Sequence, residues 1–213
     1  MLRIALILCV VLLSYVPGTS SGQDRLEELL KGASASDVEM VIQELDRGMD
    51  VDTSDREGNS LLLVASREGH FDLVQALVKR RAKVRSLNGY GESALMLASL
   101  KGHLEVVQFL LASGAELNPP GWTPLHYCAT EGRTEVCQYL LEKGADIDTL
   151  SPNGTTALMM AARFAHFTTV KLLVWEVAEL DLKNDAGQTA LTYALYSKNE
   201  EIINLLRQAG AKQ

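Results

Sequence analysis

The apolar positions of residues 121–148 predict two short helices joined by a tight turn. Thr123 is a good N-cap, and Pro124 suits the first helical position, where its missing N–H does no harm. Gly132 ends the first helix, and Gly144 is the left-handed residue that stops the second. The apolar stripes consist of Leu125, Cys128 and Ala129, followed by Val136, Cys137, Leu140 and Leu141. Neither helix can bury its stripe alone, so the pair needs neighbours of the same kind.

The same pattern recurs along the chain at an almost constant interval. Five copies, spaced by 33, 30, 33 and 33 residues, open with Gly58, Gly91, Gly121, Gly154 and Gly187. A helix-capping hydroxyl follows two residues after each of these glycines, at Ser60, Ser93, Thr123, Thr156 and Thr189. The period, the Thr-Pro-Leu-His sequence at 123–126 and the Gly-Ala-Asp at 144–146 resemble the ankyrin repeat. The resemblance covers residues 24–213.

This resemblance implies an all-α solenoid of helix-turn-helix units that carry β-hairpin-like fingers. The expected organisation is a capping repeat at 23–57 followed by repeats at 58–90, 91–120, 121–153, 154–186 and 187–213. The segment before Gly121 is three residues short and contains Pro119 and Pro120, so we expect a notch in the row of fingers. Arg81 stands at a left-handed stop, at a cost of about 1 kcal/mol. Val177 at the equivalent position predicts that its helix ends differently.

Residues 1–22 have the character of a secretory signal peptide. Arg3 provides the positive start, residues 4–13 are an unbroken apolar run, and a small-residue, helix-breaking segment follows. Cleavage after Gly18 or after Gly22 fits this pattern. The apolar run is shorter than the roughly 20 residues of a membrane-spanning helix. We therefore expect a periplasmic or secreted protein with no stable membrane span after cleavage.

The charge pattern bears on the kind of partner. The formal net charge is −7 at pH 7, which argues against binding to nucleic acid. One basic cluster interrupts the acidic chain, and it consists of Lys79, Arg80, Arg81, Lys83 and Arg85. It is either a solvated helix end, where cations suit the macrodipole, or a docking patch for an acidic partner.

Two cysteines remain in the mature chain. Cys128 and Cys137 lie symmetrically about the Gly132 turn and are expected to face each other. A disulfide is one alternative, and two buried thiols are the other. Packed helix axes lie about 8–10 Å apart, whereas a disulfide needs Cα atoms within about 6.8 Å. This comparison slightly favours two thiols.

No catalytic motif, cofactor-binding loop or metal-ligand cluster is recognisable, so we expect a protein that is not an enzyme and has no cofactor. His70, His103 and His166 recur at one repeat position. They should form a row spaced on the order of 10 Å, too widely for one metal ion, and are expected to stabilise turns. His126 and Cys128 are two residues apart on one helix and do not face each other, so they do not form a nucleophilic pair.

Function must then lie on the surface. In ankyrin-like solenoids the residues that flank the opening glycine form fingers, and the ninth and tenth residues after it lie on the concave side. These positions give the candidate partner-binding residues Arg56, Asn59, Arg67, Glu68, Tyr90, Glu92, Leu100, Lys101, Trp122, Glu131, Arg163, Phe164 and Tyr196. Aromatic side chains and arginine in a polar groove are typical of interface hot spots, and Trp122 and Phe164 are favoured over the tyrosines.

These observations predict a monomeric protein-protein interaction module that acts outside the cytoplasm and binds a partner protein through its concave face and fingers. The alternative is a dedicated inhibitor or stabilising partner of one extracytoplasmic enzyme, which shares the fold and differs in its consequence for that enzyme.

Overall fold

The structure is a computed structural model that describes residues 22–212, with side chains described from Leu26 onward. The predicted signal peptide lies outside the described residues except for Gly22, which begins the first helix. In the described part of the chain, the helices are α1 (Gly22–Ser34), α2 (Val38–Asp46), α3 (Leu61–Glu68), α4 (Phe71–Lys79), α5 (Ala94–Lys101), α6 (Leu104–Ala112), α7 (Pro124–Thr130), α8 (Thr134–Glu142), α9 (Ala157–Arg163), α10 (Phe167–Trp175), α11 (Ala190–Ser197) and α12 (Glu200–Gln208).

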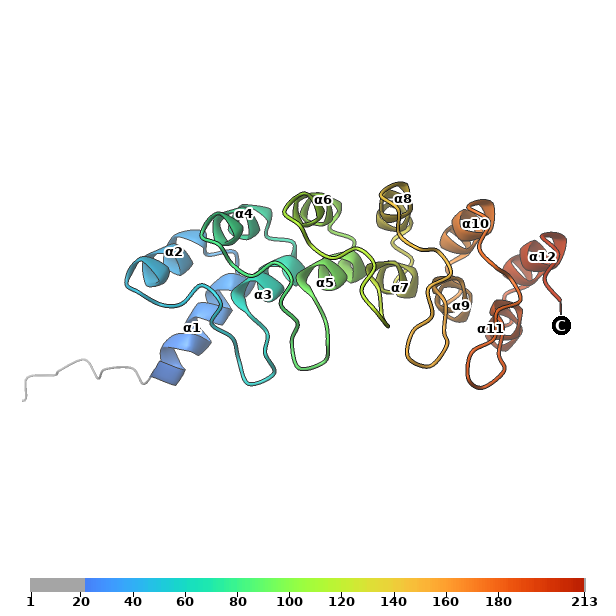
Figure 1. The fold of residues 1–213 in the computed structure, drawn as a ribbon, viewed down its shortest axis with the longest axis horizontal. Coiled ribbons are helices and arrows are strands. Elements are labelled where there is room, and N and C mark those ends of the chain that lie inside the picture. The colour runs from blue at the N-terminus through green and yellow to red at the C-terminus, as the bar shows by residue number, and fades with distance from the viewer. Residues whose placement is uncertain (1–21, 213) are drawn as a thin grey trace, which may run out of the picture.

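The helices form two parallel layers, as Figure 1 shows. The inner layer stacks α1, α3, α5, α7, α9 and α11 side by side, and the even-numbered helices form the outer layer. The loops between each outer helix and the next inner helix project as fingers, and the whole row bends toward the finger side. The all-α solenoid predicted from the sequence is therefore confirmed. None of the described helices is both long enough and apolar enough to cross a membrane.

The inner helices after α1 all begin in the same way. The hydroxyls predicted as N-caps accept the backbone N–H three residues later, as in the bond from His126 N to Thr123 Oγ1 at 3.4 Å. This local bond satisfies one of the N–H groups that a helix start leaves without a partner. The start of each repeat is therefore decided by neighbouring residues in the sequence.

The outer helices end in left-handed residues, including two that are not glycine. Arg81 has φ +68° and Val177 has φ +66°. Val177 N–H donates to Val174 O at 3.2 Å, and the following Ala178 N–H donates to Leu173 O at 3.0 Å. This is the same pair of bonds that closes α8 at Gly144, so the expectation that α10 ends differently is wrong. The chain therefore leaves α10 in the same direction as it leaves the other outer helices, and Val177 adopts a strained left-handed conformation.

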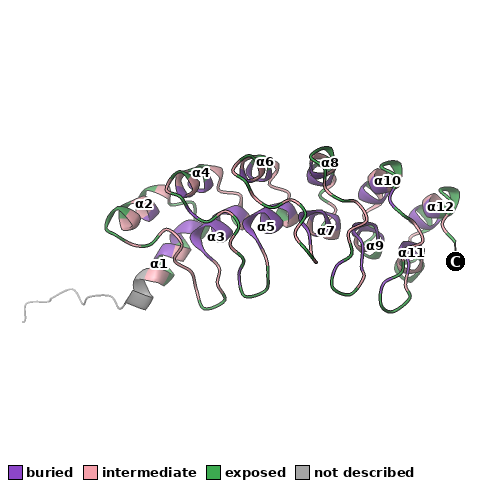
Figure 2. Cartoon of the chain, viewed as in Figure 1, coloured by how far each residue is buried: buried purple, intermediate pink, exposed green. Residues whose placement is uncertain are grey.

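The core is a continuous ribbon between the two layers rather than a central ball. Figure 2 shows that the buried faces of the inner and outer helices turn toward each other along the whole array. Four of the five repeats have a small inner residue and a branched outer one at equivalent positions, as in Ala98 with Val107 and Ala194 with Ile203, and these side chains are 0–3% exposed. In the third repeat these two positions are Cys128 and Cys137, both fully buried.

The finger of the second repeat is the exception in the row. Residues 113–123 connect α6 to α7, whereas residues 80–93 connect α4 to α5. Figure 1 shows that the α6–α7 finger projects less than its neighbours, as the three missing residues predict. Isolated antiparallel bridges close the two preceding fingers, from Ser54 to Ser60 and from Leu87 to Ser93.

Candidate protein-binding surface

The ends of the inner helices place the predicted concave residues in one row. Two adjacent repeat positions make up this row, at the ends of helices that stack side by side. Nine residues after the opening glycine stand Arg67, Leu100, Arg163 and Tyr196, and ten residues after it stand Glu68, Lys101, Glu131 and Phe164. The inner helices that carry these residues lie on the side to which the array bends, which is the concave side of the solenoid. Arg67 and Leu100 are half-buried. The exposed members of the row are Glu68, Lys101, Glu131, Arg163, Phe164 and Tyr196.

One aromatic cluster forms at the C-terminal end of this row. The Arg163 guanidinium carbon lies 5.5 Å from the ring centre of Phe164 and 5.6 Å from that of Tyr193. A hollow of about 400 Å³ lies beside it, lined by Arg163, Gln188, Tyr193, Tyr196 and Ser197. Phe164 is 46% exposed and Tyr196 is 67% exposed. We call Arg163, Phe164, Tyr193 and Tyr196 the aromatic patch.

Tyr193 is the member that sequence reasoning missed. It stands six residues after Gly187, where the first two repeats have the buried Val64 and Leu97. The third repeat also has a tyrosine here, Tyr127. A tyrosine at a position that is aliphatic in other repeats was the signal that could have found it, since a tyrosine needs water or a partner for its hydroxyl. Here Asn184 Nδ2 donates to the Tyr193 hydroxyl at 3.0 Å.

Trp122 lies differently from the aromatic patch. It is half-buried, and its ring meets the His126 ring edge-on at 5.4 Å between centres. Tyr90 at the tip of its finger is 74% exposed. Tyr90 and Tyr196 are more exposed than Trp122 and are therefore better placed to contact a partner.

Two of the predicted finger residues are engaged within the protein. Asn59 donates from its N–H and its Nδ2 to the Asp55 carboxylate, at 2.7 and 2.9 Å. The Glu92 carboxylate accepts from Asn88 Nδ2 at 2.9 Å and from the Tyr127 hydroxyl at 3.1 Å. Burial and this carboxylate raise the pKa of Tyr127, which keeps the hydroxyl a donor. These side chains hold the fingers in place, and Arg56 and Tyr90 remain exposed for contact.

Most of the basic cluster also joins repeats to one another. Arg80 pairs with Asp46 at 3.1 Å, Lys83 Nζ pairs with Asp52 at 3.3 Å, and Arg85 Nε donates to Gly114 O at 2.7 Å. These contacts favour a structural role over a docking patch, and they leave Lys79 and Arg81 as the exposed members without a described ion pair.

The recurring histidines form a ladder between repeats. The Nε2 atoms of His70, His103 and His166 lie 2.6, 3.0 and 2.9 Å from the carbonyl oxygens of Ser34, Arg67 and Thr130, respectively. Each ring thus joins the start of an outer helix to the end of the inner helix in the repeat before it, or in the capping repeat for His70. Within the part of the chain that the structure describes, no group of three or more histidine, cysteine or acidic side chains could hold a metal ion.

His126 is a buried structural group. Its Nδ1 lies 2.8 Å from Thr123 Oγ1, and its Nε2 lies 2.9 Å from the Thr155 carbonyl oxygen in the next repeat. Burial lowers its pKa below the ordinary value of 6.5. The neutral ring therefore links the third and fourth repeats.

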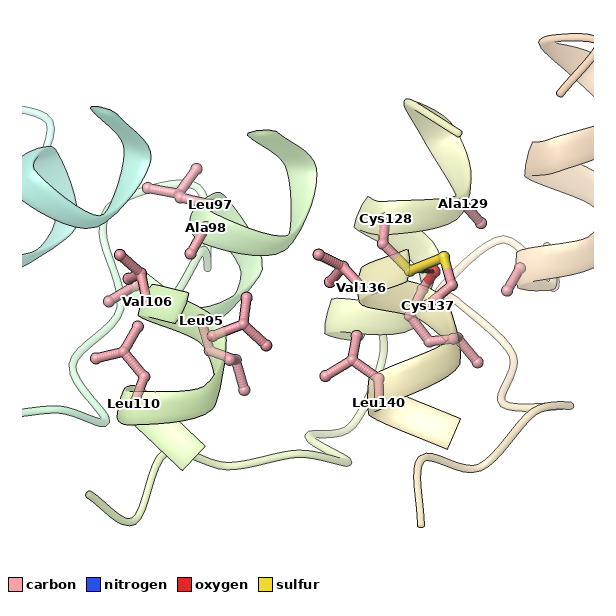
Figure 3. Close-up of a cluster of buried hydrophobic side chains, with 14 of the residues drawn as sticks. Leu95, Leu97, Ala98, Val106, Leu110, Cys128, Ala129, Val136, Cys137 and Leu140 are labelled. Carbon is pink, nitrogen blue, oxygen red and sulfur yellow. Dashed lines mark hydrogen bonds between the residues drawn. A yellow bond between two sulfur atoms is a disulfide. The ribbon is translucent and has the colours of Figure 1, made fainter. Parts of the chain in front are cut away.

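Cys128 and Cys137 form a disulfide with Cα atoms 5.6 Å apart, so the expectation of two separate thiols is corrected. Figure 3 shows the bond between facing sides of α7 and α8, next to Val136 and Leu140. The sequence argument compared axis distances with a Cα distance. Since each Cα lies about 2.3 Å from its helix axis, facing Cα atoms approach well inside the distance between the axes.

Comparison with known proteins agrees with this arrangement. The family profile described as "Ankyrin repeats (3 copies)" matches residues 24–120, 62–151 and 144–213. The chain belongs to the ankyrin repeat family. The ankyrin repeat domain of human ASB11, a crystal structure, superposes with a TM-score of 0.80 at 26% identity, covering 86% of this chain and 84% of that one.

A curated mouse protein shares part of the repeat array. Ankyrin repeat and SAM domain-containing protein 6 of Mus musculus is 38% identical over 66 residues. The match covers 30% of this ankyrin repeat chain and 8% of the relative, so the matched segment is less than a tenth of that protein. Ankyrin repeats act as protein-protein interaction modules, and this function is the one that the family membership supports.

Proposed function

We propose that the protein acts outside the cytoplasm as a monomeric module that binds one protein partner through its concave face, with the aromatic patch as the main anchor. The observation that carries this proposal is the cluster of Arg163, Phe164, Tyr193 and Tyr196 beside a hollow of about 400 Å³. Arginine and aromatic side chains that are exposed in the free protein lose most of their contact with water when a partner covers them.

Two further features support the location outside the cytoplasm. The N-terminal sequence has the charge, apolar run and small residues of a signal peptide. The Cys128–Cys137 disulfide lies in the core, and such bonds persist in oxidising compartments. Both point to the periplasm or the extracellular medium.

The proposal is tested by capture of partners from the extracytoplasmic extract of the source cells. The mature protein is compared with a Phe164→Ala, Tyr196→Ala double variant. Trp175→Ala is the matched control, because Trp175 is 75% exposed but lies on the outer helix α10. All three proteins should melt alike, since the substituted side chains are exposed.

We expect a partner that the parent and Trp175→Ala bind equally and the double variant binds at least about tenfold more weakly. Equal binding by all three proteins would exclude the aromatic patch as the anchor. If the captured partner is an enzyme, its activity with and without the ankyrin repeat protein decides whether binding inhibits or stabilises it.

A further inference from the structure

The fingers share a closing turn that one of them lacks. In four fingers a side-chain oxygen accepts the N–H four residues later, as in Glu92 N to Asn88 Oδ1 at 2.9 Å and Gln188 N to Asn184 Oδ1 at 2.9 Å. In the short finger Asn118 has a different task. Its Oδ1 accepts Asp146 N–H at 3.0 Å and its Nδ2 donates to Gly144 O at 3.0 Å. The three missing residues are therefore those that would have built the tip.

Neighbouring fingers are joined by a backbone hydrogen bond that is also missing here. Gly89 N–H donates to Glu57 O at 2.7 Å, and Asp185 N–H donates to Asn153 O at 3.1 Å. Both donors stand two residues before the glycine that opens the next repeat. Pro119 occupies this position in the short finger and has no N–H to donate.

The carbonyl oxygen that this bond would have used belongs to Tyr90. Among the described residues, no donor bonds to it. The short finger also lacks this bond to the finger that follows it, because Pro152 stands at the donor position there and has no N–H. The flank of the finger around Tyr90 is thus the edge of a ladder, comparable to the free edge of a sheet.

A hollow occupies the place of the missing tip. Its volume is about 270 Å³, and its lining is Arg85, Leu87, Gly91, Ser93, Met96, Glu116, Pro119 and Pro120. Leu87 on its wall is 57% exposed. The lining thus combines an apolar floor and wall with one positive and one negative residue, and it carries no net charge that would attract a free ion. We call this hollow the finger slot.

We propose that the finger slot binds an extended segment of a protein partner. The segment lies along the flank of the finger, donates a backbone N–H to Tyr90 O and places one apolar side chain against Leu87 and Pro119. The chain itself supplies the template for this occupant, because at Glu57 O and Asn153 O, the equivalents of Tyr90 O in two other fingers, a neighbouring finger donates its N–H. This inference rests on the proposed protein-binding function and names the kind of segment that is bound.

The probe is a display library of random linear peptides, selected on the mature protein, with the affinity of single peptides measured by fluorescence polarisation. Three variants are compared with the parent. The first inserts Thr-Leu-Ser after Asn118, which copies the residues that follow Asp148 and rebuilds a finger of full length. The second is Leu87→Ser. The third is the matched control Leu150→Ser, which removes a leucine that is 47% exposed at the same position in the finger of the third repeat.

We expect selected peptides to bind the parent and Leu150→Ser equally, to lose about tenfold or more in affinity on Leu87→Ser and to lose binding on the inserted variant. N-methylation of one peptide N–H, and of no other, should weaken binding similarly, because it removes the donor to Tyr90 O. Failure to select any peptide, or binding to the inserted variant and to Leu87→Ser that is as tight as binding to the parent, would overturn the inference. Peptide binding to the Phe164→Ala, Tyr196→Ala protein reports on the slot alone, so the two proposals fail separately.

Discussion

The Cys128–Cys137 disulfide should contribute a measurable part of the stability. The two cysteines replace the pair of a small and a branched residue that other repeats have, such as Ala98 and Val107. The double variant Cys128→Ala, Cys137→Val therefore restores the packing that the chain already uses elsewhere and removes only the cross-link.

The magnitude follows from the loop that the bond closes. For a sequence separation of 9 residues, the lost entropy of the unfolded chain corresponds to about 2.5 kcal/mol at room temperature. For a chain of this size, that free energy lowers the melting temperature by about 5–10 °C. A reducing agent should shift the parent by a comparable amount and leave the double variant unchanged, when both proteins are produced without residues 1–22, which contain Cys9, the third cysteine of the sequence.

The assay is thermal unfolding followed by circular dichroism, with and without reductant, on protein produced in an oxidising compartment. Counting free thiols in the unfolded, unreduced protein is the control, and it should find none. Two free thiols, or equal melting temperatures for the unreduced parent and the double variant, would refute the reasoning.

Two other predictions concern stability. Because burial lowers the pKa of His126, the unfolded chain binds its proton more readily than the folded protein, so stability should fall as the pH drops below 6.5. The urea midpoint of the parent should decrease more than that of His126→Gln between neutral pH and about pH 5.5, and equal decreases would exclude His126 as the cause. At Val177, whose φ is +66° and whose side chain is 81% exposed, substitution by glycine should raise stability by about 1 kcal/mol. Val177→Ala keeps a Cβ and should gain less, and a loss of stability in Val177→Gly would contradict the assignment of strain.

The end of the outer helix α10 at Val177 shows where local sequence patterns fail to predict the backbone conformation. Thr123 and its equivalents predict helix starts correctly, because a cap bonds to an N–H only three residues away. The stop at Val177 was predicted wrongly, because the path of that loop is decided by the repeats packed on either side. Local preference for φ is worth about 1–2 kcal/mol, and the packing of a whole repeat outweighs it.

The candidate surface divides in a similar way. The sequence predicts which positions face the hollow, since the period repeats the same register, and Arg163, Phe164 and Tyr196 were found in this manner. The cluster with Tyr193 depends on the distances between the fourth and fifth repeats, which carry Arg163 and Tyr193, respectively. No spacing within one repeat contains those distances.

The sequence by itself determined the repeat, its helices and its glycine turns, because these follow from caps, breakers and apolar stripes that act within a few residues. Only the tertiary structure decided that Cys128 and Cys137 are bonded and that Tyr90 O has no neighbouring donor. Both depend on how closely separate segments approach, and an approach of a few ångströms is determined by the packing of the stacked repeats.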